Sequence, residues 1–208
     1  MDTLILHISS PDALPRALDI LQGGGLVAFP TDTVYGLGAL AFDAAAVESI
    51  YAAKDRPDEK AIPVLLGGVD DLAKVTSSVP PMALTLASHF WPGPLTLVVP
   101  KHPDLPEAVS ASPTVGVRVP DHTAARALLQ AAGPMAVTSA NRSGQPSTST
   151  AEAVLAQLGG RIALILDGGK TPGGFPSTVV DCVGAEPKIL REGPVSKAEI
   201  WKILGREL

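Results

Sequence analysis

The chain has 208 residues, of which 46% are hydrophobic and 18% are charged. This composition provides enough apolar sequence for one folded core and excludes an intrinsically disordered chain. The net charge of −5 and the aromatic content of 4% argue against a generally basic surface that stacks on nucleic-acid bases.

Hydrophobic patterning and turn residues predict strands and helices in an order without strict alternation. In chain order, the expected strands are residues 4–8, 26–29, 62–66, 95–99, 115–119, 135–137, 162–166, 178–181 and 188–190. The expected helices are residues 12–21, 44–53, 80–90, 122–131, 151–158 and 196–204. With its many proline-rich connections, this order favours a single α/β domain, residues 1–208, built on a twisted mixed sheet.

The single cysteine, Cys182, lies in an apolar stretch and cannot form an internal disulfide. We expect it to be an inert core residue in a reducing compartment. The N-terminus has no basic stretch before an apolar segment, and no apolar run approaches the roughly 20 residues that span a bilayer. The sequence therefore predicts a soluble, cytoplasmic protein without membrane contact.

The segment from Phe29 to Gly38 carries the most concentrated polar pattern in the chain. A buried-looking strand stops at Pro30, and two hydroxyls, a carboxylate, a phenol and two glycines follow it. Polar groups at the end of a strand are how α/β proteins build sites for anionic ligands. On its residues alone, this segment is therefore interpreted as a phosphate-binding loop.

A cluster of cations, Lys54, Arg56 and Lys60, follows the second predicted helix, and Pro57 fixes the exit of the chain. A solvated helix end is the ordinary explanation for an isolated pair of this kind. Arginine offers a planar fork and lysine a mobile point charge, and both suit a polyphosphate. The cluster indicates a phosphate site only in combination with other segments.

Two further arginines extend the pattern. Arg118 interrupts an apolar strand and shares a face with Gly116, whose small size we expect to leave room for a ligand. A charge on such a strand is paired internally or faces a site, because an unpaired charge would cost several kcal/mol. Arg191, near the C-terminus, follows another apolar strand, so it is likewise expected to be paired internally or to face a site. Residues 138–144 are either a polar turn or a loop that donates hydrogen bonds to phosphate or ribose.

Several common site motifs do not fit this sequence. Gly169-Lys170-Thr171 lacks the earlier glycine and the following helix of a P-loop. Ser139 lacks the flanking glycines of a nucleophile elbow. The histidines have no metal-ligand spacing; they are His7, His89, His102 and His122. No covalent nucleophile is predicted.

Taken together and in order, seven segments resemble the YrdC/Sua5 family of threonylcarbamoyl-AMP synthases. They are Pro30-Thr31-Asp32-Thr33-Val34-Tyr35-Gly36-Leu37-Gly38, Lys54-Asp55-Arg56-Pro57, Trp91-Pro92-Gly93-Pro94-Leu95-Thr96, Val117-Arg118-Val119-Pro120, Ser139-Ala140-Asn141 with Ser143-Gly144, Ser177-Thr178-Val179-Val180-Asp181, and Leu190-Arg191-Glu192-Gly193. The resemblance implies a single α/β domain with a twisted mixed sheet around a large, positively lined concave cleft. It also indicates the short, single-domain form of the family.

The resemblance assigns roles to residues by position. The implied threonine-binding residues are Thr33, Arg118, Val137 and Ser177. The implied ATP-binding residues are Arg56, Lys60, Thr114, Ser139, Asn141, Ser147 and Arg191. Lys54 and Arg56 are the implied catalytic pair, and with Lys60 they would stabilise the triphosphate. Two positions depart from some relatives: Leu65 replaces a threonine-contacting histidine, and Lys60 replaces an asparagine.

The resemblance also implies the reaction, in which L-threonine, bicarbonate and ATP give threonylcarbamoyl-AMP and pyrophosphate. Mg²⁺ would accompany ATP and bridge its phosphates, and a separate tRNA threonylcarbamoyl transferase would consume the product. Two alternatives stay open: a carbamoyl-adenylate-forming relative, and a non-enzymatic module that binds double-stranded RNA. The segment from Lys170 to Pro176, rich in proline and glycine, is the expected mobile lid.

Overall fold

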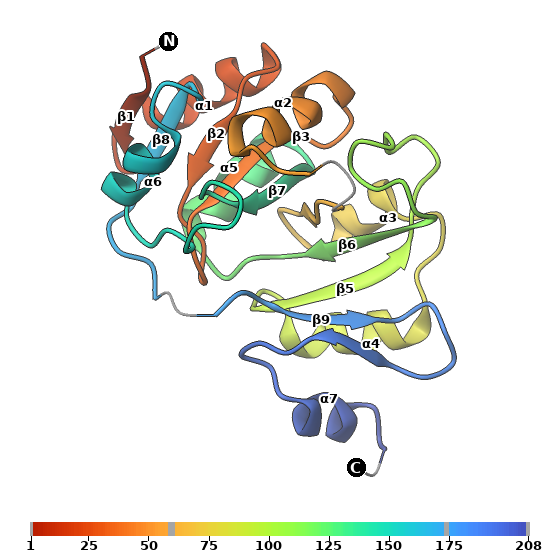
Figure 1. Ribbon diagram of the computed structural model, residues 1–208. Helices are drawn as coiled ribbons and strands as arrows, with labels where there is room; N and C mark the ends of the chain where they lie inside the picture. The colour runs from red at the N-terminus through yellow and green to blue at the C-terminus, as the bar shows by residue number, and fades with distance from the viewer. Residues whose placement is uncertain (1, 58–60, 173–174, 207–208) are drawn as a thin grey trace.

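The computed structural model describes residues 2–57, 61–172 and 175–206. These residues form one mixed sheet of ten strands in the order β1-β8-β2-β3-β7-β4-β6-β5-β9-β10 (Figure 1). The strands are β1 Leu4–His7, β2 Val27–Phe29, β3 Gly36–Leu40, β4 Val64–Leu65, β5 Leu95–Pro100, β6 Thr114–Arg118, β7 Met135–Ser139, β8 Leu164–Asp167, β9 Thr178–Asp181 and β10 Lys188–Arg191. The helices are α1 Ala13–Gln22, α2 Ala44–Lys54, α3 Leu72–Val75, α4 Pro81–Phe90, α5 Thr123–Ala132, α6 Ala151–Leu158 and α7 Lys197–Ile203, with a short 3₁₀ turn over Val69–Asp71 before α3.

The sheet mixes both directions of pairing, as the sequence predicts. β8 pairs in parallel with β1 and β2, while β4 pairs in parallel with β6, and β5 with β9. The remaining neighbours are antiparallel, including β3 with both β2 and β7. β7 is antiparallel to β4 and β6 is parallel to it, so β6 and β7 run in opposite directions. The ends of β2 and β7 and the start of β3 therefore lie at one edge of the sheet, and the ends of β6 and β10 and the starts of β5 and β9 lie at the other. Residues from both of these groups line the cavity described below.

Core residues lie on both faces of the sheet because successive strand side chains point to opposite sides. In β2, Val27 and Phe29 pack with α1 and α5, whereas Ala28 belongs to the larger cluster on the other face. Buried residues of α2, α3, α4, α6 and α7 contribute to that larger cluster. In Figure 1, α4 and α7 lie beside β9 at the C-terminal end of the sheet.

Local features fix the helix ends. Asp43 caps α2, since its Oδ1 accepts a hydrogen bond from the Ala46 amide at 3.0 Å. Pro15 lies in the first turn of α1, where its missing N–H leaves no helical bond unmade. Cys182 is fully buried behind β9, as expected. The burial of Cys182 confirms the prediction that it is a core residue.

The segment expected as a phosphate-binding loop differs from the prediction. Its last three residues, Gly36 to Gly38, belong to β3, a central strand paired with both β2 and β7. Glycine is uncommon in strands, so the sequence pattern around Gly36 and Gly38 did not predict β3. They are required there because a β-carbon at Gly36 would lie 2.7 Å from the Val137 methyl group, and one at Gly38 would lie 2.8 Å from Met135 Cε. The helix α3 was also not predicted.

Candidate active site

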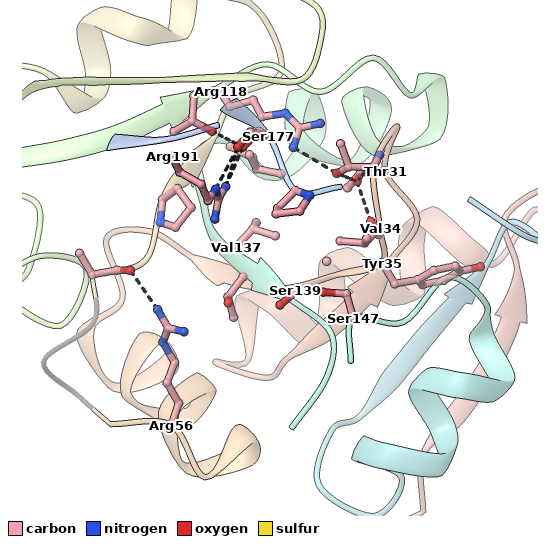
Figure 2. A pocket seen from close by; sticks show the side chains of 18 residues that line it. Thr31, Val34, Tyr35, Arg56, Arg118, Val137, Ser139, Ser147, Ser177 and Arg191 are labelled. Atoms are coloured by element: carbon pink, nitrogen blue, oxygen red, sulfur yellow. Dashed lines mark hydrogen bonds between the residues drawn. The ribbon is translucent and has the colours of Figure 1, made fainter. Parts of the chain in front are cut away.

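A cavity of about 300 Å³, at the lower end of the range for small-molecule pockets, is lined by residues from both groups of strand ends. Figure 2 shows side chains from segments far apart in the sequence converging on it. Among the described residues, three arginines and no acidic side chain line it. Eight residues predicted to bind ligand line this cavity: Thr33, Arg56, Arg118, Val137, Ser139, Ser147, Ser177 and Arg191.

Arg118 is held from three directions at the end of β6. Its Nε donates to the Gly93 carbonyl at 2.9 Å, its Nη1 to the Thr33 hydroxyl at 3.3 Å, and its Nη2 to Asp32 Oδ1. Burial lowers the pKa of Arg118, and the Asp32 carboxylate opposes that shift. Two of its five N–H groups have no hydrogen-bond acceptor among the described residues, so Arg118 can still bind an anionic ligand.

The ligand space expected beside Gly116 is filled by protein. A β-carbon at Gly116 would lie 3.1 Å from Thr96 Cγ2 and 3.5 Å from Pro63 Cβ. The glycine therefore allows neighbouring side chains to pack on the strand, and this part of the prediction is wrong. The cavity lies further along, over Arg118, Thr96 and Leu65.

Arg191 and Ser177 form a second rigid unit on the β9–β10 hairpin. Arg191 donates from Nε and Nη2 to the Ser177 carbonyl, at 3.0 and 2.8 Å, and from Nη2 to the Ser177 hydroxyl at 3.2 Å. The Ser177 hydroxyl also lies 2.7 Å from that of Thr96. Figure 2 shows the Arg191 fork pointing at Ser177. A planar guanidinium held in this way keeps a fixed positive charge at the cavity wall.

Arg56 enters the cavity from the turn after α2. Asp55 ends the helix in the left-handed conformation, with φ of 51°, and the Arg56 amide then donates to the Tyr51 carbonyl at 3.0 Å. The guanidinium donates to the Ala61 carbonyl at 3.1 Å and lies 6.0 Å from the Tyr51 ring centroid. In Figure 2, Arg56 and Arg118 lie on opposite sides of Val137.

The position of Lys54 differs from its predicted role at the triphosphate. Its side chain is 1% exposed, does not line the cavity, and donates to the carbonyls of Ser139 and Asn141. Burial, followed by the nearby Arg56 charge, lowers the pKa of Lys54 to about 7. A buried ammonium group needs hydrogen-bond acceptors, and the two carbonyls supply them. Lys54 therefore holds the end of β7 and the turn after it in place.

Two other predicted residues, Asn141 and Thr114, do not line the cavity. Asn141 is buried and donates to the carbonyls of Arg142 and Gln145, at 2.9 and 2.8 Å, so it shapes the turn after β7. Thr114 begins β6 and its hydroxyl lies 3.0 Å from that of Ser112. Lys60 lies outside the described residues.

The expected lid is described only in part. Gly173 and Gly174 lie outside the described residues, and Thr171 is buried, with its amide donating to the Ser149 carbonyl at 2.9 Å. Pro176 lines the cavity. Whether the segment moves stays a prediction.

Residue-by-residue reasoning missed Thr31 and Thr96 as parts of the cavity wall. Thr31 is 3% exposed and Thr96 is 4% exposed, yet each places its hydroxyl against a predicted ligand-binding residue. A hydroxyl two positions before Thr33 was a usable signal for Thr31. Thr96 had no such signal, because only the parallel pairing of β5 with β9 brings it to Ser177.

The mixed sheet and the arginine- and hydroxyl-lined cavity define an α/β protein with a binding site for anionic ligands. The chain belongs to the Sua5/YciO/YrdC family, whose model, described as "Telomere recombination", matches residues 19–193. No helix among the described residues is both long and apolar enough to cross a membrane.

Individual relatives agree with this assignment. A Bacillus subtilis protein named threonylcarbamoyl-AMP synthase is 44% identical over 195 residues, covering 92% of this chain and 56% of that protein. A Mycobacterium tuberculosis protein is 44% identical over 190 residues, covering 91% of this chain and 88% of that protein. The crystal structure of Pyrococcus abyssi Sua5 complexed with L-threonine matches with a TM-score of 0.94 and 39% identity, covering 98% of this chain and 62% of that one. The chain thus spans little more than half of the Bacillus relative.

Proposed function

We propose that the protein is a threonylcarbamoyl-AMP synthase, which converts L-threonine, bicarbonate and ATP into threonylcarbamoyl-AMP and pyrophosphate. The observation that carries the proposal is one cavity shared by two sets of residues. Thr33, Arg118 and Ser177, proposed for the amino acid, lie in the same cavity as Arg56 and Arg191, proposed for ATP. The relatives named for this activity and the threonine complex of a relative support the same assignment.

The reaction needs positioning more than a protein nucleophile. The threonine amine attacks CO₂ derived from bicarbonate, forms a carbon–nitrogen bond and loses a proton. One oxygen of the resulting N-carboxylate then attacks the α-phosphorus of ATP, and pyrophosphate leaves with the electron pair of the broken phosphorus–oxygen bond. Two anions must approach each other in this second step, so fixed positive charge lowers its barrier.

The arginines supply that charge from separate anchors. We assign Arg118 to the threonine carboxylate, because it lies next to Thr33 and two of its N–H groups have no acceptor among the described residues. Arg56 and Arg191 are assigned to the ATP phosphates by their positions in the family. They reach the same cavity from two different parts of the fold. Their guanidinium groups stay charged at neutral pH, although burial lowers the pKa of both.

Mg²⁺ is proposed as part of the MgATP substrate. No three histidine, cysteine, aspartate or glutamate side chains gather into a metal-binding group within the described parts of the chain. The cavity wall offers hydroxyl and guanidinium groups, which do not form the carboxylate-rich set that Mg²⁺ prefers. The ion would therefore be carried by the phosphates of ATP.

The downstream partner and the cellular location belong to the same proposal. A threonylcarbamoyl adenylate is a mixed anhydride and must be consumed by a group-transfer enzyme, for which a tRNA threonylcarbamoyl transferase is proposed. A cytoplasmic location would bring the protein together with tRNA and ATP.

Pyrophosphate release tests the function against both alternatives. Purified protein with MgATP is given threonine and bicarbonate, carbamoyl phosphate, or neither, and pyrophosphate is measured. Release that requires both threonine and bicarbonate supports the synthase. Release with carbamoyl phosphate alone would favour the carbamoyl-adenylate-forming class, and salt-sensitive binding of double-stranded RNA without turnover would favour the RNA-binding module.

A further inference from the structure

A chain of hydrogen bonds links Thr31, Thr33 and Arg118 along the cavity wall. The Thr31 hydroxyl lies 2.6 Å from the Val34 carbonyl oxygen, accepts from the Thr33 amide at 3.2 Å, and lies 3.1 Å from the Thr33 hydroxyl. Arg118 Nη1 lies 3.3 Å from that same Thr33 hydroxyl. Figure 2 shows the contact between Thr31 and Val34 beside Arg118.

The direction of these bonds follows from counting protons. A hydroxyl has one proton to donate and two lone pairs. Thr31 must donate to Val34, because a carbonyl oxygen can only accept. Thr31 then meets the Thr33 hydroxyl with a lone pair, so Thr33 donates its own single proton to Thr31. Arg118 occupies one lone pair of Thr33, and a single acceptor position remains.

The pair formed by Thr96 and Ser177 has the opposite property. Only one of their two protons can lie between the hydroxyls, which are 2.7 Å apart. Arg191 donates to the Ser177 hydroxyl, so this bond uses neither of the two hydroxyl protons. One proton of this pair therefore stays available for a ligand acceptor. Thr33 accepts, whereas Arg118 and the Thr96–Ser177 pair donate, so the wall is chemically polarised.

We propose that Thr31 is a positioning residue that makes Thr33 a hydrogen-bond acceptor, so that Thr33 binds the α-amino group of the amino-acid substrate while Arg118 binds its carboxylate. This assignment rests on the proposed function and deepens it. An amine that donates an N–H to Thr33 keeps its lone pair for CO₂. A Thr33 hydroxyl that donated instead would occupy that lone pair and block carboxylation.

Calorimetric binding of matched ligands tests this assignment. L-threonine, L-threoninamide, which lacks the carboxylate charge, and 3-hydroxybutanoate, which lacks the amine, are titrated into wild type and Thr33→Val. Loss of one hydrogen bond should weaken threonine and threoninamide about fivefold to tenfold and leave 3-hydroxybutanoate within about twofold. Thr33→Ser should restore binding. Thr85→Val, which removes a hydroxyl on α4 outside the cavity, is the matched control.

Thr31 is tested by a double-mutant cycle. Thr31→Val should weaken threonine binding about twofold to fivefold with ATP binding unchanged, and it should add nothing in the Thr33→Val background. Independent losses would show a merely structural role and overturn the assignment. A loss seen equally with 3-hydroxybutanoate would also overturn it, by placing Thr33 at another group. Absence of threonine binding to wild type would overturn the proposed function as well.

Discussion

The carboxylate of Asp32 and the guanidinium of Arg118 form a buried ion pair that joins the loop after β2 to the end of β6. The two side chains are 12% and 7% exposed. The pair holds the arginine toward the cavity while Nε and Nη1 bond to other groups. Asp32 is therefore a structural requirement for the orientation of a predicted substrate-binding residue.

Replacement of Asp32 tests this relationship. Asp32→Asn keeps the shape of the side chain but leaves the buried Arg118 charge without a counter-ion. We expect the free energy of unfolding to fall by about 2–3 kcal/mol, measured by urea denaturation. Asp121→Asn, which breaks an exposed pair with Arg126, is the control and should cost less than about 1 kcal/mol. Equal losses in the two variants would contradict the proposed importance of burial.

Arg56 is the cavity arginine whose removal should affect catalysis with the least effect on folding. Arg56→Ala is expected to reduce threonine- and bicarbonate-dependent pyrophosphate release by a hundredfold or more, because it removes charge from the displacement step. Its circular dichroism spectrum should match that of wild type. Arg126→Ala, on the outer face of α5, should retain full release. Wild-type activity of the Arg56 variant would remove this residue from the site.

Lys54 gives a prediction with a defined pH dependence. Lys54→Met leaves the carbonyls of Ser139 and Asn141 without their donor and should destabilise the fold by about 2 kcal/mol near pH 7. The pKa of Lys54 is lowered to about 7 in the folded protein, below its ordinary value of 10.5.

The lowered pKa determines the sign of the pH effect. Above pH 7 the unfolded chain binds one more proton at this lysine than the folded chain does, and below pH 7 both forms bind it. The stability of wild type relative to Lys54→Met should therefore rise with pH above about 7, by up to about 1.4 kcal/mol per unit, and stay level below it. Urea denaturation from pH 6 to 9 measures this difference. A difference that falls with rising pH would contradict the lowered pKa.

Cys182 is expected to be unreactive in the native protein. Burial, with a smaller effect from Asp181, raises the pKa of its thiol to about 12, and the side chain is fully covered. A thiol-specific chromogenic reagent at pH 8 should therefore label it only after denaturation. Rapid labelling of the folded protein would show that the core around β9 opens readily.

The fold was largely predictable where the chain follows a regular pattern. α6 has the predicted bounds, and α2 and α4 differ from theirs by one residue, because caps and prolines mark their ends. β3 was not predicted, because its glycines serve contacts with β2 and β7 that no local pattern reveals. β7 continues two residues beyond its predicted end, since pairing with β3 draws Thr138 and Ser139 into the sheet.

The site was predictable as a set of residues more than as a geometry. The family resemblance placed eight residues that line one cavity, but it could not separate Arg56, which faces the cavity, from Lys54, which is buried. Lys54 is the last residue of α2 and Arg56 follows two positions later. The left-handed conformation of Asp55 between them points the two side chains in different directions. The partners of Arg118 and Ser177 depend on contacts between distant segments, which local sequence patterns do not reveal.

The central claim is that one cavity joins threonine, bicarbonate and ATP into a single adenylate. Mass spectrometry of the product formed from MgATP, L-threonine and carbon-13-labelled bicarbonate tests it most directly. We expect an adenylate that contains threonine and one labelled carbon, formed in equal amount with pyrophosphate. An adenylate without the label, or AMP without threonine, would contradict it.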